Sequence, residues 1–276
     1  MTSDVVIKVK HNITIILALV LIFFVAQSMG LWITHQYSDN PQLPLGIETP
    51  EIEESTSFIP IFILILIATG IGLLLARFNL SFIWKFWFLF TIWFTLVISL
   101  TILLGENLAI LFATVLALLR VYKNNTVIHN FTEIFIYGAL ATLFTPIFNI
   151  TSVFILLILI SIYDYIAVRK TKHMIKLAKF EGNLKVFAGI LIPYKKGVAI
   201  LGGGDIGFPL LFAAVAMKEF VLPFLSIKTF IIPICVAISL ALLFFYGDNK
   251  KYYPAMPYIT LGCTAGYLIL LLTNLF

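Results

Sequence analysis

Two aspartates lie within long apolar stretches of this sequence. Asp164 is the single charged residue of the run Thr151–Val168. Asp205 is likewise the single charged residue of the run Val198–Met217. A carboxylate inside a membrane costs about 3 kcal/mol or more, so by default it marks a functional site. Two such acids can share one proton, so that one activates a water while the other protonates a carbonyl oxygen. The residues alone leave three interpretations open: an aspartyl protease, a proton relay in a transporter, and a buried acid paired with a hydroxyl.

The composition indicates an integral membrane protein. Of the 276 residues, 61% are hydrophobic and 11% are charged, whereas soluble domains carry about 25% charged residues. The apolar runs are too long for barrel strands, which leaves an all-α bundle. Cys235 and Cys263 lie inside apolar runs, so we expect free thiols. The spacing of His, Cys and acidic residues matches no metal site, and we expect neither a metal nor a cofactor.

Nine apolar runs predict nine transmembrane helices, because about 20 residues cross a hydrocarbon core about 30 Å thick. The basic composition of 169–197 predicts a loop, and Asn130 and Glu133 predict the capped start of the fifth helix. We divide the chain into 1–180 (six spans), the cytoplasmic loop 181–197, and 198–276 (three spans). The predicted spans are Ile13–Thr34, Phe58–Ala76, Phe82–Leu104, Leu108–Leu119, Phe131–Phe148, Thr151–Val168, Val198–Met217, Phe220–Tyr246 and Tyr258–Phe276.

The distribution of basic residues predicts the orientation of these spans. With a cytoplasmic N-terminus, nine spans place the C-terminus outside and put sixteen of the eighteen Lys and Arg on the cytoplasmic side. Only Lys218 and Lys228 fall outside. This agrees with the positive-inside rule. The net charge of +5 therefore reflects the membrane and not a nucleic-acid partner. The cytoplasmic residues are Lys8, Lys10, Arg77, Lys85, Arg120, Lys123, Arg169, Lys170, Lys172, Lys176, Lys179, Lys185, Lys195, Lys196, Lys250 and Lys251.

The two aspartates are expected at similar depth. Asp164 precedes Arg169 by five residues, and Asp205 follows Lys196 by nine. At about 1.5 Å per residue these spacings are roughly 7 and 13 Å from the cytoplasmic edge. The segment 196–200 either begins the seventh helix or forms an extended edge for an unwound substrate, and the sequence leaves both alternatives open.

The glycines before Asp205 indicate close backbone packing. Gly202, Gly204 and Gly207 match the spacing of a dinucleotide fingerprint, but no βαβ unit surrounds them. Small residues here allow helices to approach closely and the helix start to unwind. Helix packing alone remains the structural alternative.

Three motifs in order resemble one family. They are Tyr163-Asp164, Gly202-Gly203-Gly204-Asp205 and Pro254-Ala255-Met256-Pro257. Together they resemble the intramembrane aspartyl proteases, which include presenilin, signal peptide peptidase and, most similar here, their archaeal homologues. The resemblance implies that Asp164 and Asp205 are the catalytic pair. It also implies that the active site is lined by Tyr163, Gly202, Gly204, Pro254, Ala255, Met256 and Pro257. Met256 replaces the leucine of the family motif, a change that conserves volume.

The resemblance implies an endopeptidase that hydrolyses peptide bonds within transmembrane helices of other membrane proteins. A cytoplasmic loop 169–197 orients the pair as in presenilin, so we expect substrates whose N-terminus lies outside. The expected location is the lipid bilayer, in the plasma membrane of an archaeon, and the oligomeric state is left open. A proton-coupled transporter or channel explains the two acids but not the Pro-Ala-Met-Pro element. A prepilin peptidase shares a Gly-x-Gly-Asp motif but lacks that element.

Overall fold

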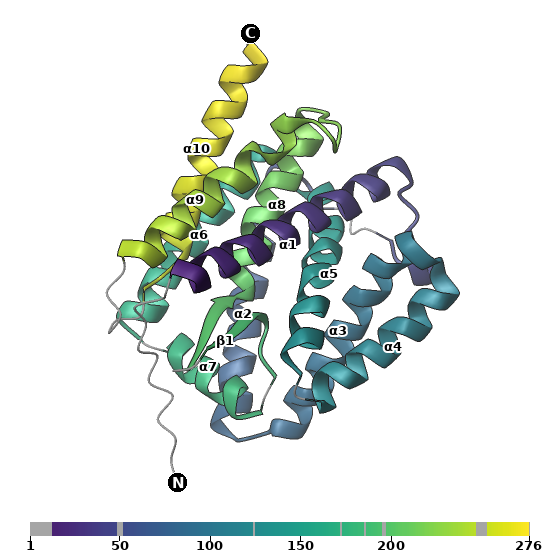
Figure 1. Ribbon diagram of the computed structural model, residues 1–276, viewed down its shortest axis with the longest axis vertical. Helices are drawn as coiled ribbons and strands as arrows, with labels where there is room; N and C mark the ends of the chain where they lie inside the picture. Colours follow the sequence, from purple (N-terminus) through teal and green to yellow (C-terminus); the bar gives the residue numbers. More distant parts are fainter. Residues whose placement is uncertain are drawn as a thin grey trace.

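The computed structural model describes residues 13–48, 52–123, 125–171, 173–184, 186–194, 197–246 and 253–275. Eight of the lysines used to predict the orientation lie outside these residues: Lys8, Lys10, Lys172, Lys185, Lys195, Lys196, Lys250 and Lys251. The protein is a bundle of helices with one small two-stranded sheet at one end (Figure 1). The helices are α1 Ile13–Asp39, α2 Phe58–Arg77, α3 Ser81–Leu104, α4 Glu106–Tyr122, α5 Thr126–Phe144, α6 Ile150–Arg169, α7 His173–Leu184, α8 Gly203–Glu219, α9 Ile231–Tyr246 and α10 Met256–Leu275. The strands are β1 Gly189–Tyr194 and β2 Gly197–Gly202, and the 3-10 turns are η1 Pro44–Gly46, η2 Thr145–Ile147 and η3 Ile227–Phe230.

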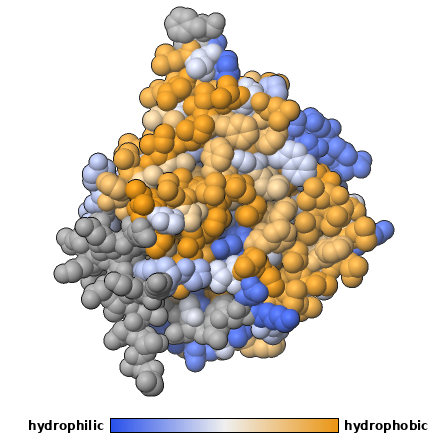
Figure 2. Space-filling model, viewed as in Figure 1, coloured by the Kyte–Doolittle hydropathy of each residue, from blue (hydrophilic) through white to orange (hydrophobic). Residues whose placement is uncertain are grey.

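The all-α membrane class is confirmed. Within the described residues, seven helical segments are long and apolar enough to cross a membrane. They are α1, α2, α3, α5 with η2, α6, α9 with η3, and α10. Helices α4 and α8 have 17 residues each, or about 26 Å at 1.5 Å per residue. Figure 2 shows hydrophobic residues over most of one face, as expected of a surface that lipid covers.

Helix α8, which carries Asp205, forms the centre of the bundle. It contacts α1, α5, α6, α9 and α10, and every residue from Pro209 to Met217 is buried. A helix that is apolar on all sides belongs in the interior of a large protein. The glycine Gly30 of α1 allows close approach, because a Cβ at that position would lie 2.3 Å from Leu210 of α8. The body of α8 is thus fixed at the centre of the molecule, and its first turn leads out from there.

The prediction that Val198–Met217 is one helix is wrong at its start. Residues Gly197–Gly202 form strand β2, which pairs antiparallel with β1 in the register Leu191↔Ile200. The helix begins only at Gly203. Gly189 and Gly197 adopt positive φ at the starts of the two strands, a conformation that favours glycine. Of the two alternatives for 196–200, the structure shows the extended one, although Lys196 itself lies outside the described residues.

The start of α5 also differs from the prediction. Asn130 is not the N-cap; Asn125 is, and its side chain accepts the N–H groups of Val127 at 2.8 Å and Ile128 at 3.3 Å. Asn125 satisfies two of the donors that a helix start leaves without partners. The helix therefore begins five residues earlier than predicted, and His129, Asn130 and Glu133 lie inside it with their side chains free to bind other elements.

Two predicted segments contain more structure than expected. The predicted loop 169–197 holds the amphipathic helix α7 and strand β1. The predicted span Phe220–Tyr246 is broken after α8, where Val221 has positive φ and Pro223 follows, and the helix resumes at η3 and α9. Helix α10 begins at Met256, two residues before the predicted start. Pro257 fits its first turn, where a missing N–H costs nothing.

Candidate active site

The first aspartate, Asp164, lies on α6 and binds the segment that leads into α10. Its Oδ2 accepts the backbone N–H of Met256 at 3.2 Å, and the carboxylate also accepts the N–H of Ala255. The Ala255 carbonyl already accepts the N–H groups of Tyr258 and Ile259, so the helical bonding of α10 starts there. The first N–H groups of a helix have no partner within it. Asp164 therefore acts as a cap for α10.

The second aspartate, Asp205, lies in the first turn of α8. Its carboxylate accepts the backbone N–H of Gly202, the residue directly before the helix. This bond is one half of the capping-box arrangement, in which the acid three residues into a helix reaches back to its start. Both carboxylates thus lie at helix N-termini, that of Asp164 at the start of α10 and that of Asp205 at the start of α8. The partial positive charge of a helix start stabilises a carboxylate.

The structure brings the two carboxylates into one site. Helices α6 and α8 pack against each other, and the charge of Asp164 acts on Asp205. Across the described part of the chain, none of the ion pairs includes either aspartate. Gln27 of α1 is fully buried and donates to the carbonyl of Ile206 at 2.8 Å, which fixes the residue next to Asp205. Two acids on packed helices therefore lie near enough for the charge of one to act on the other.

Of the seven other predicted site residues, three bind the carboxylates directly and four do not. Gly202 binds Asp205, and Ala255 and Met256 bind Asp164, so these three adjoin the carboxylates directly. Pro254 and Pro257 flank the two residues bound by Asp164. Tyr163 is oriented differently, because its hydroxyl lies 2.9 Å from Nε2 of His173 on α7. A Cβ added to Gly204 would meet only the ring of Phe208, on its own helix.

Gly203 has a clearer steric role than the two glycines predicted from the sequence. A Cβ at Gly203 would lie 2.9 Å from the hydroxyl of Tyr137 on α5 and 3.3 Å from the carbonyl of Ala188. The N–H of Gly203 donates to that same carbonyl at 3.0 Å. Since any side chain would separate α8 from both neighbours, the middle glycine is the one that close packing requires.

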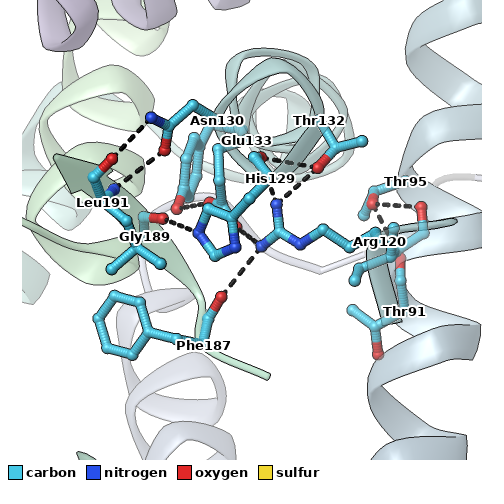
Figure 3. Close-up of polar contacts among 12 residues, drawn as sticks. Thr91, Thr95, Arg120, His129, Asn130, Thr132, Glu133, Phe187, Gly189 and Leu191 are labelled. Atoms are coloured by element: carbon cyan, nitrogen blue, oxygen red, sulfur yellow. Dashed lines mark hydrogen bonds and ion pairs between the residues drawn. The ribbon is translucent and has the colours of Figure 1, made fainter. Parts of the chain in front are cut away.

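A buried polar network lies beside this site, and the sequence interpretation missed it. Arg120 of α4 donates to Glu133 and to the carbonyl of His129, and it donates to the hydroxyl of Thr132 at 2.5 Å (Figure 3). The hydroxyl of Tyr137 donates to the second carboxylate oxygen of Glu133. The side chains of Arg120 and Glu133 are each 1% exposed. A buried ion pair whose two charged groups make further hydrogen bonds is the arrangement that a low-dielectric interior requires.

The network also reaches strand β1. Arg120 donates to the carbonyl of Phe187 at 3.0 Å, and His129 Nε2 lies 2.7 Å from the carbonyl of Gly189. Asn130 makes two bonds to Leu191, donating to its carbonyl at 2.7 Å and accepting its N–H at 3.0 Å. Figure 3 shows His129 and Asn130 directed toward β1, and Arg120 directed toward Phe187, which precedes the strand. The signal in the sequence was the i, i+4 pair His129 and Glu133, together with an arginine at the end of an apolar run.

Comparisons with known proteins identify the family and agree with the fold. Residues 13–205 match the family model of signal-peptide peptidase, presenilin aspartyl protease. A comparison with curated proteins finds no match. Two solved structures of a presenilin family intramembrane aspartate protease, in space groups C222 and P2, are similar over almost their whole length. The first has 23% identity and a TM-score of 0.63, and covers 92% of this chain and 95% of the other. The second has 21% identity and a TM-score of 0.64, with 93% and 97% covered.

The family match spans more than two thirds of the chain. The chain therefore belongs to the signal-peptide peptidase and presenilin family of aspartyl proteases. It is a multi-pass membrane protein and an enzyme of the intramembrane aspartyl protease class.

Proposed function

We propose that this protein hydrolyses peptide bonds within transmembrane helices of other membrane proteins, with a water activated between Asp164 and Asp205. The observation that carries the proposal is the pair itself. Two carboxylates from adjacent helices interact in one site, and each is held by backbone N–H groups at a helix start.

The chemistry follows from one proton shared between two acids. The ionised carboxylate takes a proton from the water as its oxygen attacks the peptide carbonyl, while the neutral acid protonates the carbonyl oxygen. The resulting gem-diol collapses when the acid that took the water proton gives it to the amide nitrogen, the other carboxylate takes a proton from a gem-diol hydroxyl, and the C–N bond breaks. No covalent intermediate with the enzyme forms. The backbone donors on both aspartates keep the carboxylates oriented through these transfers.

Strand β2 supports a proposal for how the substrate is held. Residues of a strand alternate in the direction of their backbone groups. Because α5 binds the N–H and carbonyl of Leu191, its register partner Ile200 directs its own backbone groups away from β1. Val198 and Gly202 share that direction. We propose that an unwound substrate segment pairs with this edge of β2, which leads directly to Asp205.

Further features of the proposal come from the sequence. We propose that α4 and α8 cross the membrane together with the seven longer segments, which gives nine spans. The N-terminus is cytoplasmic in this proposal, and the membrane is the plasma membrane of an archaeon. This orientation favours substrates whose N-terminus lies outside. Tyr163, Gly202, Gly204 and 254–257 line the site. The division 1–180, 181–197 and 198–276 stays part of this proposal.

The test is cleavage by the purified protein. We expect it to cut a model transmembrane peptide at a position within the apolar segment, as measured by mass spectrometry. A transition-state inhibitor of aspartyl proteases should stop the reaction. Proton-driven flux without any peptide cleavage would instead favour the transporter, which the comparisons do not support.

A further inference from the structure

The outer edge of the sheet is occupied by a helix. Strand β1 has β2 on one side and α5 on the other, and α5 binds it with side chains in place of a third strand. His129 binds the carbonyl of Gly189, and Asn130 binds both backbone groups of Leu191. Gly189 and Leu191 are two residues apart, so these are the successive groups of β1 that point away from β2.

The same face of α5 also contacts the start of α8. The ring of Tyr137 lies against Gly207, and its hydroxyl lies against Gly203. Gly203 is bonded in turn to Ala188, the residue before β1. One helix therefore determines the position of the strand and that of the turn that presents Asp205.

The two hydrogen bonds between Asn130 and Leu191 determine which residue of β1 lies against α5. An amide that donates to the carbonyl and accepts the N–H of one residue fits that residue alone. If β1 slipped by one residue, the backbone N–H and C=O groups opposite Asn130 would point toward β2 and could not bond to it. The smallest slip that restores both hydrogen bonds is therefore two residues. The ion pair of Arg120 and Glu133, buried one turn away, prevents α5 from following such a slip.

We infer that Asn130 is a positioning residue that sets the register of the β1–β2 sheet relative to Asp205, and thereby the bond of the substrate that is cut. This inference rests on the proposed function, since it requires that a substrate pairs with β2. A substrate strand that pairs with Val198 and Ile200 would move with these residues along the axis of β2, relative to the aspartates. A two-residue change in the sheet then places a different peptide bond at the aspartates.

The experiment compares cleavage positions in full-length purified variants, with a model transmembrane peptide as substrate and mass spectrometry of the products. Asn130→Ala removes both bonds to Leu191, and Asn130→Asp keeps only the acceptor for the Leu191 N–H. Val127→Ala is the matched control, because Val127 lies on the same helix and is 77% exposed. Thermal unfolding of each variant reports whether the fold is kept.

For the wild type and Val127→Ala we expect the same dominant cleavage position. For Asn130→Ala we expect about fivefold slower cleavage and products spread over positions two residues apart. Asn130→Asp should give an intermediate spread. A merely structural residue would change the rate or the unfolding temperature and leave the position unchanged.

Two results overturn the inference alone: an active, folded Asn130→Ala or Asn130→Asp that cuts only at the wild-type position, or failure of both variants to fold, which would make Asn130 a folding residue. Absence of any cleavage by the wild type would overturn the proposed function, and this inference with it.

Discussion

At the scale of residues, the site replaces the hydration of each carboxylate with backbone donors. Asp164 receives N–H groups from Ala255 and Met256, and Asp205 receives one from Gly202. These donors lie at or directly before helix starts, where the backbone N–H groups have no partner within the helix. The arrangement stabilises partly buried acids without an ion pair among the described residues, which leaves their protons available for exchange.

Asparagine at either aspartate should abolish cleavage. The amide keeps an oxygen for the backbone N–H groups but has no acid proton to exchange. We expect Asp164→Asn and Asp205→Asn each to lose at least about a hundredfold in rate, and the double variant to be little worse, since the two act as a unit. Unfolding temperatures within a few degrees of wild type serve as the control. Proteolysis retained in either single variant would contradict the proposed mechanism.

The ion pair beside the site should be sensitive to removal of one partner. Arg120→Met leaves Glu133 buried without its charge partner, which we expect to cost about 3–5 kcal/mol in the free energy of unfolding. Replacing both, as in Arg120→Met with Glu133→Leu, should recover much of that loss. Denaturant unfolding in detergent measures both. A single variant as stable as wild type would show that the pair contributes little.

At the scale of elements, small residues decide how closely the helices approach. Gly262 and Gly266 are four residues apart on α10 and face α9. A Cβ at Gly262 would lie 2.8 Å from the Cα of Val236, and one at Gly266 would lie 2.7 Å from the Cα of Ile232. Backbone atoms cannot move aside as a flexible side chain can. This is the small-xxx-small pattern of helix pairs in membranes, and α10 carries the segment that Asp164 binds.

Enlarging these glycines should separate α9 from α10. We expect Gly262→Leu to destabilise the protein by about 1–3 kcal/mol through overpacking and to lower cleavage, because the Ala255–Met256 segment shifts from Asp164. Gly70→Leu on α2 is the matched control, since nothing lies within 4 Å of its Cβ position. Equal unfolding temperatures for the two variants would contradict this account of the α9–α10 interface.

Helix α7 contains an acid that should make stability depend on pH. Burial raises the pKa of Glu181 from 4.5 to about 7, and the charge of Glu133 adds to the rise. An acid whose folded pKa is raised stabilises the fold below its unfolded pKa, and this contribution is lost as the pH rises to about 7. We expect Glu181→Gln to be more stable than wild type at pH 8 by about 1–2 kcal/mol after allowance for solvent screening, and to match it near pH 4. Thermal unfolding across this range would show no difference if Glu181 is well solvated.

At the scale of the whole molecule, the charges and the fold together predict an orientation. The acidic segment 35–57 and the α7 region lie at opposite sides of the membrane if α1 crosses it from the cytoplasm. The sheet, α7 and the basic residues then share the cytoplasmic side with the aspartates.

Cysteine labelling tests this orientation. Leu45→Cys, at a residue that is 42% exposed, should react with an impermeant reagent added outside intact cells. Lys176→Cys, on an exposed position of α7, should react only after the membrane is opened. The unmodified protein is the control, because Cys235 and Cys263 lie within α9 and α10. The reverse pattern would invert the topology and the expected preference for substrates with an outside N-terminus.

The amino-acid sequence was enough to predict the membrane class, most of the helix positions and the two aspartates. Each of these depends on local composition: apolar runs report burial in lipid, and a charge within such a run is costly wherever the chain goes. Tertiary contacts were needed to show that Gly197–Gly202 is a strand, that Asn130 binds β1 and does not cap α5, and that Gly203 is the most closely packed of the three glycines before Asp205. Those features depend on partners distant in the chain, such as Leu191 for Asn130 and Tyr137 for Gly203. The start of α5 has several possible capping residues, and Gly197–Gly202 is a short apolar segment beside glycines. From the sequence alone, the secondary structure at both places is ambiguous, because it depends on those distant partners.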